Sequence, residues 1–157
     1  MKKHNFIAIA LATWFGCGLF PAAPGTVGSL AAILIAWALH AWFGLAPFWF
    51  GILGVLLIAP GVWSATIVAR ALHRDDPQMV VVDEVIGQWI TLAAAPVLNW
   101  KSYLAALLLF RLFDIWKPPP VRQLERLREG AGIIADDVMA GIYGAVVMIV
   151  LGYSHLF

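Results

Sequence analysis

Charged residues are scarce in this chain of 157 residues, where they make up only 12% of the sequence. No Asp, Glu, Lys or Arg occurs between Lys3 and Arg70. This scarcity, with 62% hydrophobic residues and a mean hydropathy of +0.88, excludes an ordinary soluble domain. The net charge of +1 lacks the basic excess that nucleic-acid binding normally requires, so no nucleic-acid partner is expected.

Several catalytic and binding motifs are also missing. The single cysteine, Cys17, excludes an internal disulfide and is expected to pack against apolar neighbours. The four histidines are far apart and show no zinc-binding spacing. A Pro/Gly-rich stretch, 21–29, has no P-loop lysine, so nucleotide binding is not expected.

Long hydrophobic segments dominate what is present, and they predict an all-α integral membrane protein with residues 1–157 as a single domain. We expect a compact bundle of about five transmembrane helices plus an N-terminal helix that is re-entrant or interfacial. The five expected spans are Val27–Ala46, Phe48–Ala69, Val85–Leu98, Tyr103–Trp116 and Val138–Tyr153, and the N-terminal segment is Asn5–Phe20.

Basic residues decide the expected orientation. If the first segment dips into the membrane and returns, Lys2, Lys3 and most Arg residues fall on one side, and Lys101 is left on the other. The positive-inside rule makes the crowded side cytoplasmic. The stretches 21–29, 75–84, 114–117 and 130–137 then meet at that interface and can build one site. The start resembles a signal peptide but lacks a good cleavage site, so we interpret it as retained.

Two acidic pairs stand at predicted helix starts, Asp83-Glu84 and Asp136-Asp137. Helix capping is the simpler interpretation, but a cap requires only one acid. Adjacent carboxylates repel each other unless a cation lies near them, and Mg²⁺ prefers such oxygen ligands. These four acids are therefore our candidate metal ligands.

Arg111, Asp114 and Lys117 recur every three residues and share one helix face. An ion pair within the helix explains Arg111 and Asp114. Lys117 precedes three prolines, which hold it at the helix end, and a lysine there suits a phosphate. In the stretch 21–29, Thr26 or Ser29 is expected to cap the helix that this stretch leads into. The exposed amides at the start of that helix could also hold an anion.

Four ordered blocks resemble the phosphatidylglycerophosphatase A family: 24–29 (PGTVGS), 82–89 (VDEVIGQW), 110–118 (FRLFDIWKP) and 130–137 (GAGIIADD), the last leading into Ala140-Gly141. The resemblance implies a bacterial inner-membrane, Mg²⁺-dependent enzyme of phospholipid biosynthesis with its active site on the cytoplasmic side. It would hydrolyse phosphatidylglycerophosphate to phosphatidylglycerol and inorganic phosphate.

On this hypothesis Asp83, Glu84, Asp136 and Asp137 hold one or two Mg²⁺, and Asp114 is a further ligand or orients the attacking water. Lys117 and Arg111 grip the phosphate, while Pro24, Gly25, Thr26 and Ser29 line the headgroup site. Apolar helices receive the acyl chains of the membrane lipid.

Other interpretations stay open at this point. One aspartate could instead form an aspartyl phosphate. A small cation transporter could use the same carboxylates, although it would carry them along a path within its helices. A membrane assembly factor without catalysis would tolerate changes to these acids. The sequence also leaves open whether the chain forms a homo-oligomer.

Overall fold

The structure is a computed structural model that describes residues 3–153, with side chains from residue 6 onward. Its elements are α1 (Lys3–Ala12), the 3-10 helix η1 (Cys17–Leu19), α2 (Pro24–Phe43), α3 (Pro47–Leu72), α4 (Val82–Ala93), α5 (Trp100–Trp116), α6 (Val121–Leu124) and α7 (Gly130–Tyr153). No strand occurs within this range, which confirms the all-helical prediction. The side chains of Lys2 and Lys3, used to predict the orientation, lie outside the described residues.

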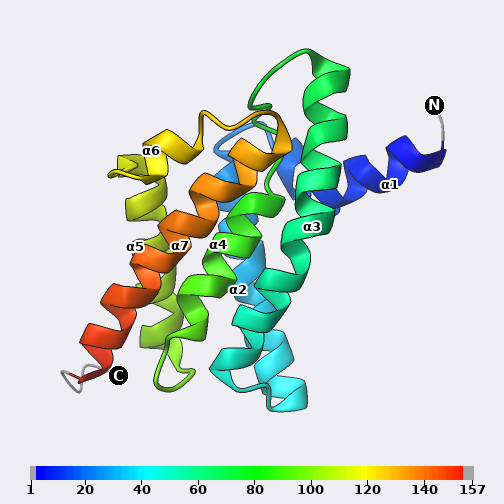
Figure 1. The fold of residues 1–157 in the computed structure, drawn as a ribbon. Helices are drawn as coiled ribbons and strands as arrows, with labels where there is room; N and C mark the ends of the chain where they lie inside the picture. The colour runs from blue at the N-terminus through cyan, green and yellow to red at the C-terminus, as the bar shows by residue number, and fades with distance from the viewer. Residues whose placement is uncertain (1–2, 154–157) are drawn as a thin grey trace.

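Five helices, α2, α3, α4, α5 and α7, lie side by side in the bundle (Figure 1). Among the described residues, however, only α2, α3 and α7 are long and apolar enough to cross a membrane, three against the five spans predicted. The 12 residues of α4 reach about 18 Å, short of a ~30 Å hydrocarbon layer. The 17-residue α5 is also short and carries Lys101, Arg111 and Asp114.

The short helix α4 is the centre of the bundle and contacts α2, α3, α5 and α7. Nine of its residues are buried, including both Asp83 and Gln88. It crosses α7 where Gly87 meets Gly141: a Cβ on Gly141 would lie 2.6 Å from the Gly87 carbonyl oxygen. Only glycine permits this backbone contact, so the closely packed glycines join helices of one chain.

The N-terminal segment is a short helix followed by a 3-10 turn, and it does not cross the bundle as a span. Helix α1 has 10 residues, about 15 Å, and is too short to span. It lies against α3 (Figure 1), and the chain then turns through η1. The Ala12 carbonyl accepts a hydrogen bond from the Val81 N–H at 2.8 Å, which ties this segment to the start of α4.

Two helices begin earlier than the sequence predicted. Helix α2 begins at Pro24 rather than Val27, and its N-cap residue is Ala23, so the prediction that Thr26 or Ser29 is the cap is wrong. Helix α7 begins at Gly130 rather than Val138. Asp136 and Asp137 therefore lie roughly two turns inside a helix instead of at its start. The chain turns between α2 and α3, since α2 ends at Phe43 and α3 begins at Pro47.

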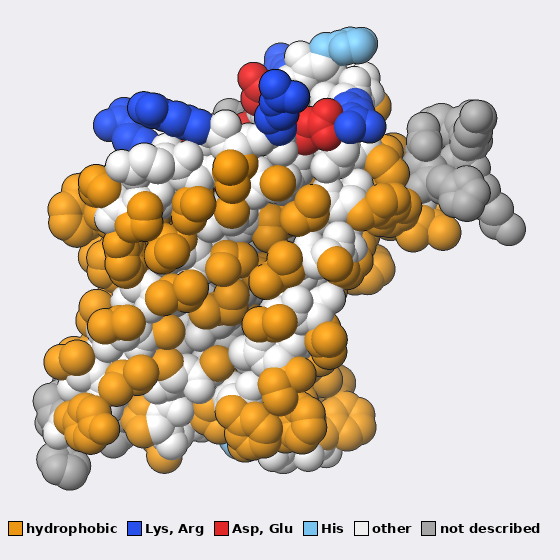
Figure 2. All heavy atoms as spheres, in the orientation of Figure 1, with side chains coloured by type: hydrophobic (Ala, Val, Ile, Leu, Met, Phe, Trp, Pro, Cys, Tyr) orange, Lys and Arg blue, Asp and Glu red, His pale blue; other side chains and the backbone are white. Residues whose placement is uncertain are grey.

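Charge and apolar surface separate along the bundle. Figure 2 shows Lys, Arg, Asp and Glu side chains gathered at one end, over a flank covered with hydrophobic side chains. Figure 1 shows that α6 and the start of α7 lie at that end. The starts of α2 and α4 and the end of α5 belong to the same end, because the helices alternate in direction. This end contains the candidate site.

Candidate active site

A cavity of about 570 Å³ opens at the charged end of the bundle. Residues from all four predicted stretches line it: 21–25 at the start of α2, 75–84 before and within α4, 111–117 of α5, and 133–137 of α7. The prediction that these separate segments meet at one site is thus confirmed. All nine carboxylates of the chain line this cavity, together with Arg111 and Lys117.

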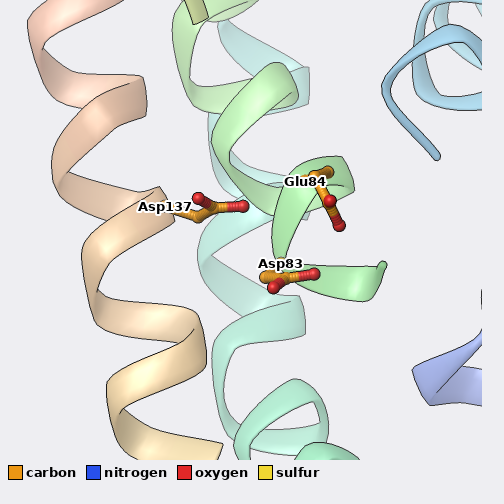
Figure 3. A group of neighbouring side chains, drawn as sticks. All are labelled: Asp83, Glu84 and Asp137. Carbon is orange, nitrogen blue, oxygen red and sulfur yellow. The ribbon is translucent and has the colours of Figure 1, made fainter. Parts of the chain in front are cut away.

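Three of these carboxylates form a compact group. Asp83 and Glu84 stand in the first turn of α4, and Asp137 reaches toward them from α7 (Figure 3). One oxygen from each lies within 4.8 Å of the other two. Asp83 and Asp137 are buried, at 8% and 4% exposure. The close crossing of α4 and α7 at Gly87 and Gly141 brings this group together.

The bonding of this group fits a cation and not a helix cap. The N-cap of α4 is Val81, and no side chain makes a capping hydrogen bond there. Asp83 Oδ1 and Glu84 Oε2 are buried and have no hydrogen-bond partner. Buried carboxylate oxygens that lack donors and lie close to each other are destabilising unless a proton or cation neutralises them. Three carboxylates are also the oxygen ligands that Mg²⁺ accepts, so these residues fit the implied metal.

Asp136 lies apart from this group of three. Its Oδ2 accepts a hydrogen bond from Lys117 Nζ at 2.8 Å, and its Oδ1 accepts one from the Asp137 N–H at 3.0 Å. The structure therefore places it beside the lysine rather than in the carboxylate group, although sequence analysis counted it as a metal ligand. Neighbours in sequence serve different partners because successive residues on a helix point about 100° apart.

Lys117 ends α5 in a left-handed conformation, with φ of 48°. Besides Asp136, its Nζ lies 3.2 Å from Glu125 Oε1. Partial burial opposes the charge on this ammonium, but the hydrogen bonds and charges of Asp136 and Glu125 outweigh it and raise the pKa of Lys117. Lys117 therefore remains protonated at neutral pH.

Arg111 connects two of the carboxylate residues. Its Nη1 donates to Asp114 Oδ2 at 2.7 Å, which confirms the predicted ion pair within α5, and lies 3.8 Å from Glu84 Oε1. The guanidinium thus faces the edge of the three-carboxylate group. Elsewhere in the cavity lining, burial raises the pKa of Asp76 despite the nearby charge of Lys117.

The start of α2 forms one wall of the cavity through Pro24 and Gly25. A Cβ on Gly25 would collide with Glu84 Oε1, so the missing side chain lets α2 approach this acid. Thr26 and Ser29 do not line the cavity. Thr26 is exposed, and the buried Ser29 hydroxyl donates to the Gly25 carbonyl at 3.0 Å.

Sequence reasoning missed four acids of the cavity: Asp75, Asp76, Glu125 and Glu129. None belongs to a pair within an apolar segment, so local pattern did not distinguish them from ordinary loop charges. The available signal was global. All nine carboxylates fall between residues 75 and 137. Because the rest of the chain is apolar, they can be expected to gather at the same solvated end of the molecule.

Comparisons with known proteins agree with this geometry. A family model described as Phosphatidylglycerophosphatase A matches residues 10–152. A Bacteroides thetaiotaomicron protein, provisionally named a phosphatidylinositol-3-phosphatase, is 41% identical over 157 residues, covering 96% of each chain. Proteins named Phosphatidylglycerophosphatase A from Escherichia coli and Haemophilus influenzae are each 40% identical. Their alignments cover 91% and 93% of this chain and 82% and 89% of theirs. No solved structure matches the chain.

Proposed function

Because the chain belongs to the phosphatidylglycerophosphatase A family, we propose that it removes the terminal phosphate of phosphatidylglycerophosphate in a Mg²⁺-dependent hydrolysis. The products are phosphatidylglycerol and inorganic phosphate, and the reaction serves phospholipid biosynthesis. Membership of the family shows that the chain is a phosphatase. The substrate and the metal are the parts that we propose.

The charge balance of the cavity supports the proposal that a metal ion is required. Nine carboxylates line the cavity with two cationic side chains, Arg111 and Lys117, and Glu129 also pairs with Arg70, which leaves a formal excess of six negative charges. A phosphate monoester is itself an anion and would be repelled from such a cavity. One or more divalent cations reverse the sign of the field at the three-carboxylate group and let the phosphate approach.

Each residue has a proposed role. Asp83, Glu84 and Asp137 hold Mg²⁺, which would supply charge neutralisation and a more acidic water when bound. Lys117 and Arg111 bind the phosphate oxygens from the other side and stabilise charge during transfer. Asp114 aligns Arg111 through their 2.7 Å contact and borders the space for the attacking water. Pro24 and Gly25 form the wall next to the lipid headgroup.

We also propose an orientation in which the cavity faces the cytoplasm of the bacterial cell, at its inner membrane. Three candidate spans support a membrane location. Arg70, Arg74 and the three arginines at 122, 126 and 128 belong to the helix ends and loops around the cavity, whereas Lys101 stands at the start of α5, at the opposite end. The positive-inside rule favours the crowded end as cytoplasmic.

The transporter alternative is not favoured, because the acids gather in one cavity at one end rather than along a path through the bundle. The name of the Bacteroides thetaiotaomicron relative suggests a phosphoinositide as the alternative substrate to test. Both lipids carry a phosphate monoester, so the same cavity chemistry applies and only the headgroup differs.

The test measures phosphate release by purified protein in detergent, from phosphatidylglycerophosphate and from phosphatidylinositol 3-phosphate, with Mg²⁺ or with chelator. Asp83→Asn and Asp137→Asn should each lose at least about a hundredfold in kcat/KM, the size expected when a ligand of a catalytic cation is lost. Arg122→Gln, a charge removal at an exposed position of α6, is the control. Folded protein that releases no phosphate from either lipid would refute the proposal.

A second measurement tests for one covalent route, in which water attacks the carboxyl carbon of an aspartyl phosphate; attack at its phosphorus would label the phosphate just as direct hydrolysis does. In H₂¹⁸O a single turnover by direct water attack puts the label into the released phosphate and leaves the enzyme unlabelled. An aspartyl phosphate hydrolysed by attack at its carboxyl carbon would leave ¹⁸O in that carboxylate, detectable by peptide mass spectrometry.

A further inference from the structure

The two cationic side chains of the cavity differ in how firmly their partners are held. Arg111 faces Asp114 and Glu84, whose side chains are 15% and 13% exposed. Lys117 faces one buried and one exposed carboxylate: Asp136 is 7% exposed and Glu125 is 45% exposed. Only the lysine therefore has a partner that water and an incoming ligand can reach readily.

Asp136 is held on both oxygens. Oδ2 accepts from Lys117 at 2.8 Å, and Oδ1 accepts from the Asp137 N–H at 3.0 Å. Separating this buried ion pair would leave an unpaired charge, which is strongly unfavourable. Asp136 is thus a fixed support that orients the ammonium toward the cavity.

Glu125 has the opposite character. It follows α6, a helix of four residues, and its contact with Lys117 is longer, at 3.2 Å. Exposed ion pairs contribute little to stability, because solvent screens them and ordering two long side chains is costly. A lysine has three N–H donors, and the two carboxylates engage two of them. A phosphate group carries more charge than one carboxylate and competes well for this ammonium.

We propose that substrate phosphate displaces Glu125 from Lys117, while Asp136 keeps its contact with the same ammonium. Glu125 then acts as a built-in competitor that returns to Lys117 when inorganic phosphate leaves. This inference rests on the proposed function, since it assigns Lys117 to the transferred phosphate. It makes Glu125 a determinant of phosphate affinity and Asp136 a positioning residue.

The experiment titrates inorganic phosphate into the Mg²⁺-loaded protein in detergent by calorimetry, and measures KM and kcat with phosphatidylglycerophosphate in parallel. Glu125→Gln should lower the phosphate Kd and the KM by about two- to fivefold, the effect of one exposed ion pair. Glu129→Gln is the matched comparison: it removes the same charge from the same rim, but its carboxylate pairs with Arg70 at 2.8 Å. It should change both constants less.

Asp136 has a different expected signature. Asp136→Asn should raise the phosphate Kd and KM at least about tenfold, because the ammonium loses its buried partner. Asp136→Glu restores part of the affinity if a carboxylate is what positions the lysine. A purely structural role would lower thermal stability without this recovery.

The outcomes are distinct. Equal effects of Glu125→Gln and Glu129→Gln would overturn the inference, since general charge removal would then explain the change. A higher phosphate Kd in Glu125→Gln would overturn it as well, whatever the enzyme hydrolyses. If wild-type protein binds phosphate but hydrolyses no lipid, the proposed function fails, and the calorimetric comparison still decides the role of Glu125.

Discussion

Replacing Asp137 with Asn should stabilise the metal-free protein while it destroys activity. Asp83, Glu84 and Asp137 each place a carboxylate oxygen within 4.8 Å of the other two. At an effective dielectric constant near 20, each ionised pair at this separation costs about 3 kcal/mol. The substitution removes two of the three pairs. Protonation limits the cost in the wild type, because protonating one ordinary carboxyl at pH 7 requires about 4 kcal/mol.

The expected gain for metal-free Asp137→Asn is therefore about 2–4 kcal/mol, after allowing about 1 kcal/mol for imperfect packing of the amide. At about 2–4 °C per kcal/mol, the apparent Tm should rise by roughly 5 °C or more. Mg²⁺ should stabilise the wild type more than the variant. It should raise the Tm of the wild type and have little effect on the variant, which has lost one of the three carboxylates that would hold the ion.

The assay follows tryptophan fluorescence of detergent-solubilised protein during heating, first with chelator and then across a Mg²⁺ titration. Glu129→Gln is the control, because it removes a carboxylate that pairs with Arg70 and should lower stability slightly without changing the response to Mg²⁺. The reasoning is wrong if chelated Asp137→Asn melts below the wild type and Mg²⁺ still raises its Tm as much.

Three further predictions concern helix packing, the cavity wall and a buried hydrogen bond. Gly141→Ala should lower the free energy of unfolding by about 1–3 kcal/mol, measured by denaturant titration, because its Cβ meets backbone of α4 at 2.6 Å. Gly25→Ala should lower kcat/KM with little change in Tm, since its Cβ displaces only the end of the Glu84 side chain. Trp89→Phe should cost about 1 kcal/mol of unfolding free energy, because the indole N–H donates to the buried Ala32 carbonyl at 3.0 Å.

Local pattern singled out residues that the structure brings to one cavity, because the chain contains so few charges. Asp83-Glu84, Asp114 and Lys117 stand out against apolar surroundings, and all of them line the one cavity. The same pattern overestimated the number of spans. Hydrophobic residues in α4 face neighbouring helices on nearly every side, and a buried core helix has the same composition as a short transmembrane one.

The sequence by itself determined the class of molecule: an apolar chain must form helices that satisfy their own backbone, and its few carboxylates must collect where water or a cation can reach them. Tertiary structure alone decided which carboxylates act together. Asp137 meets Asp83 and Glu84, whereas the adjacent Asp136 turns to Lys117 and so to Glu125. That division depends on the direction of each side chain on α7 and on the crossing of α4 and α7 at two glycines, neither of which is encoded in local spacing.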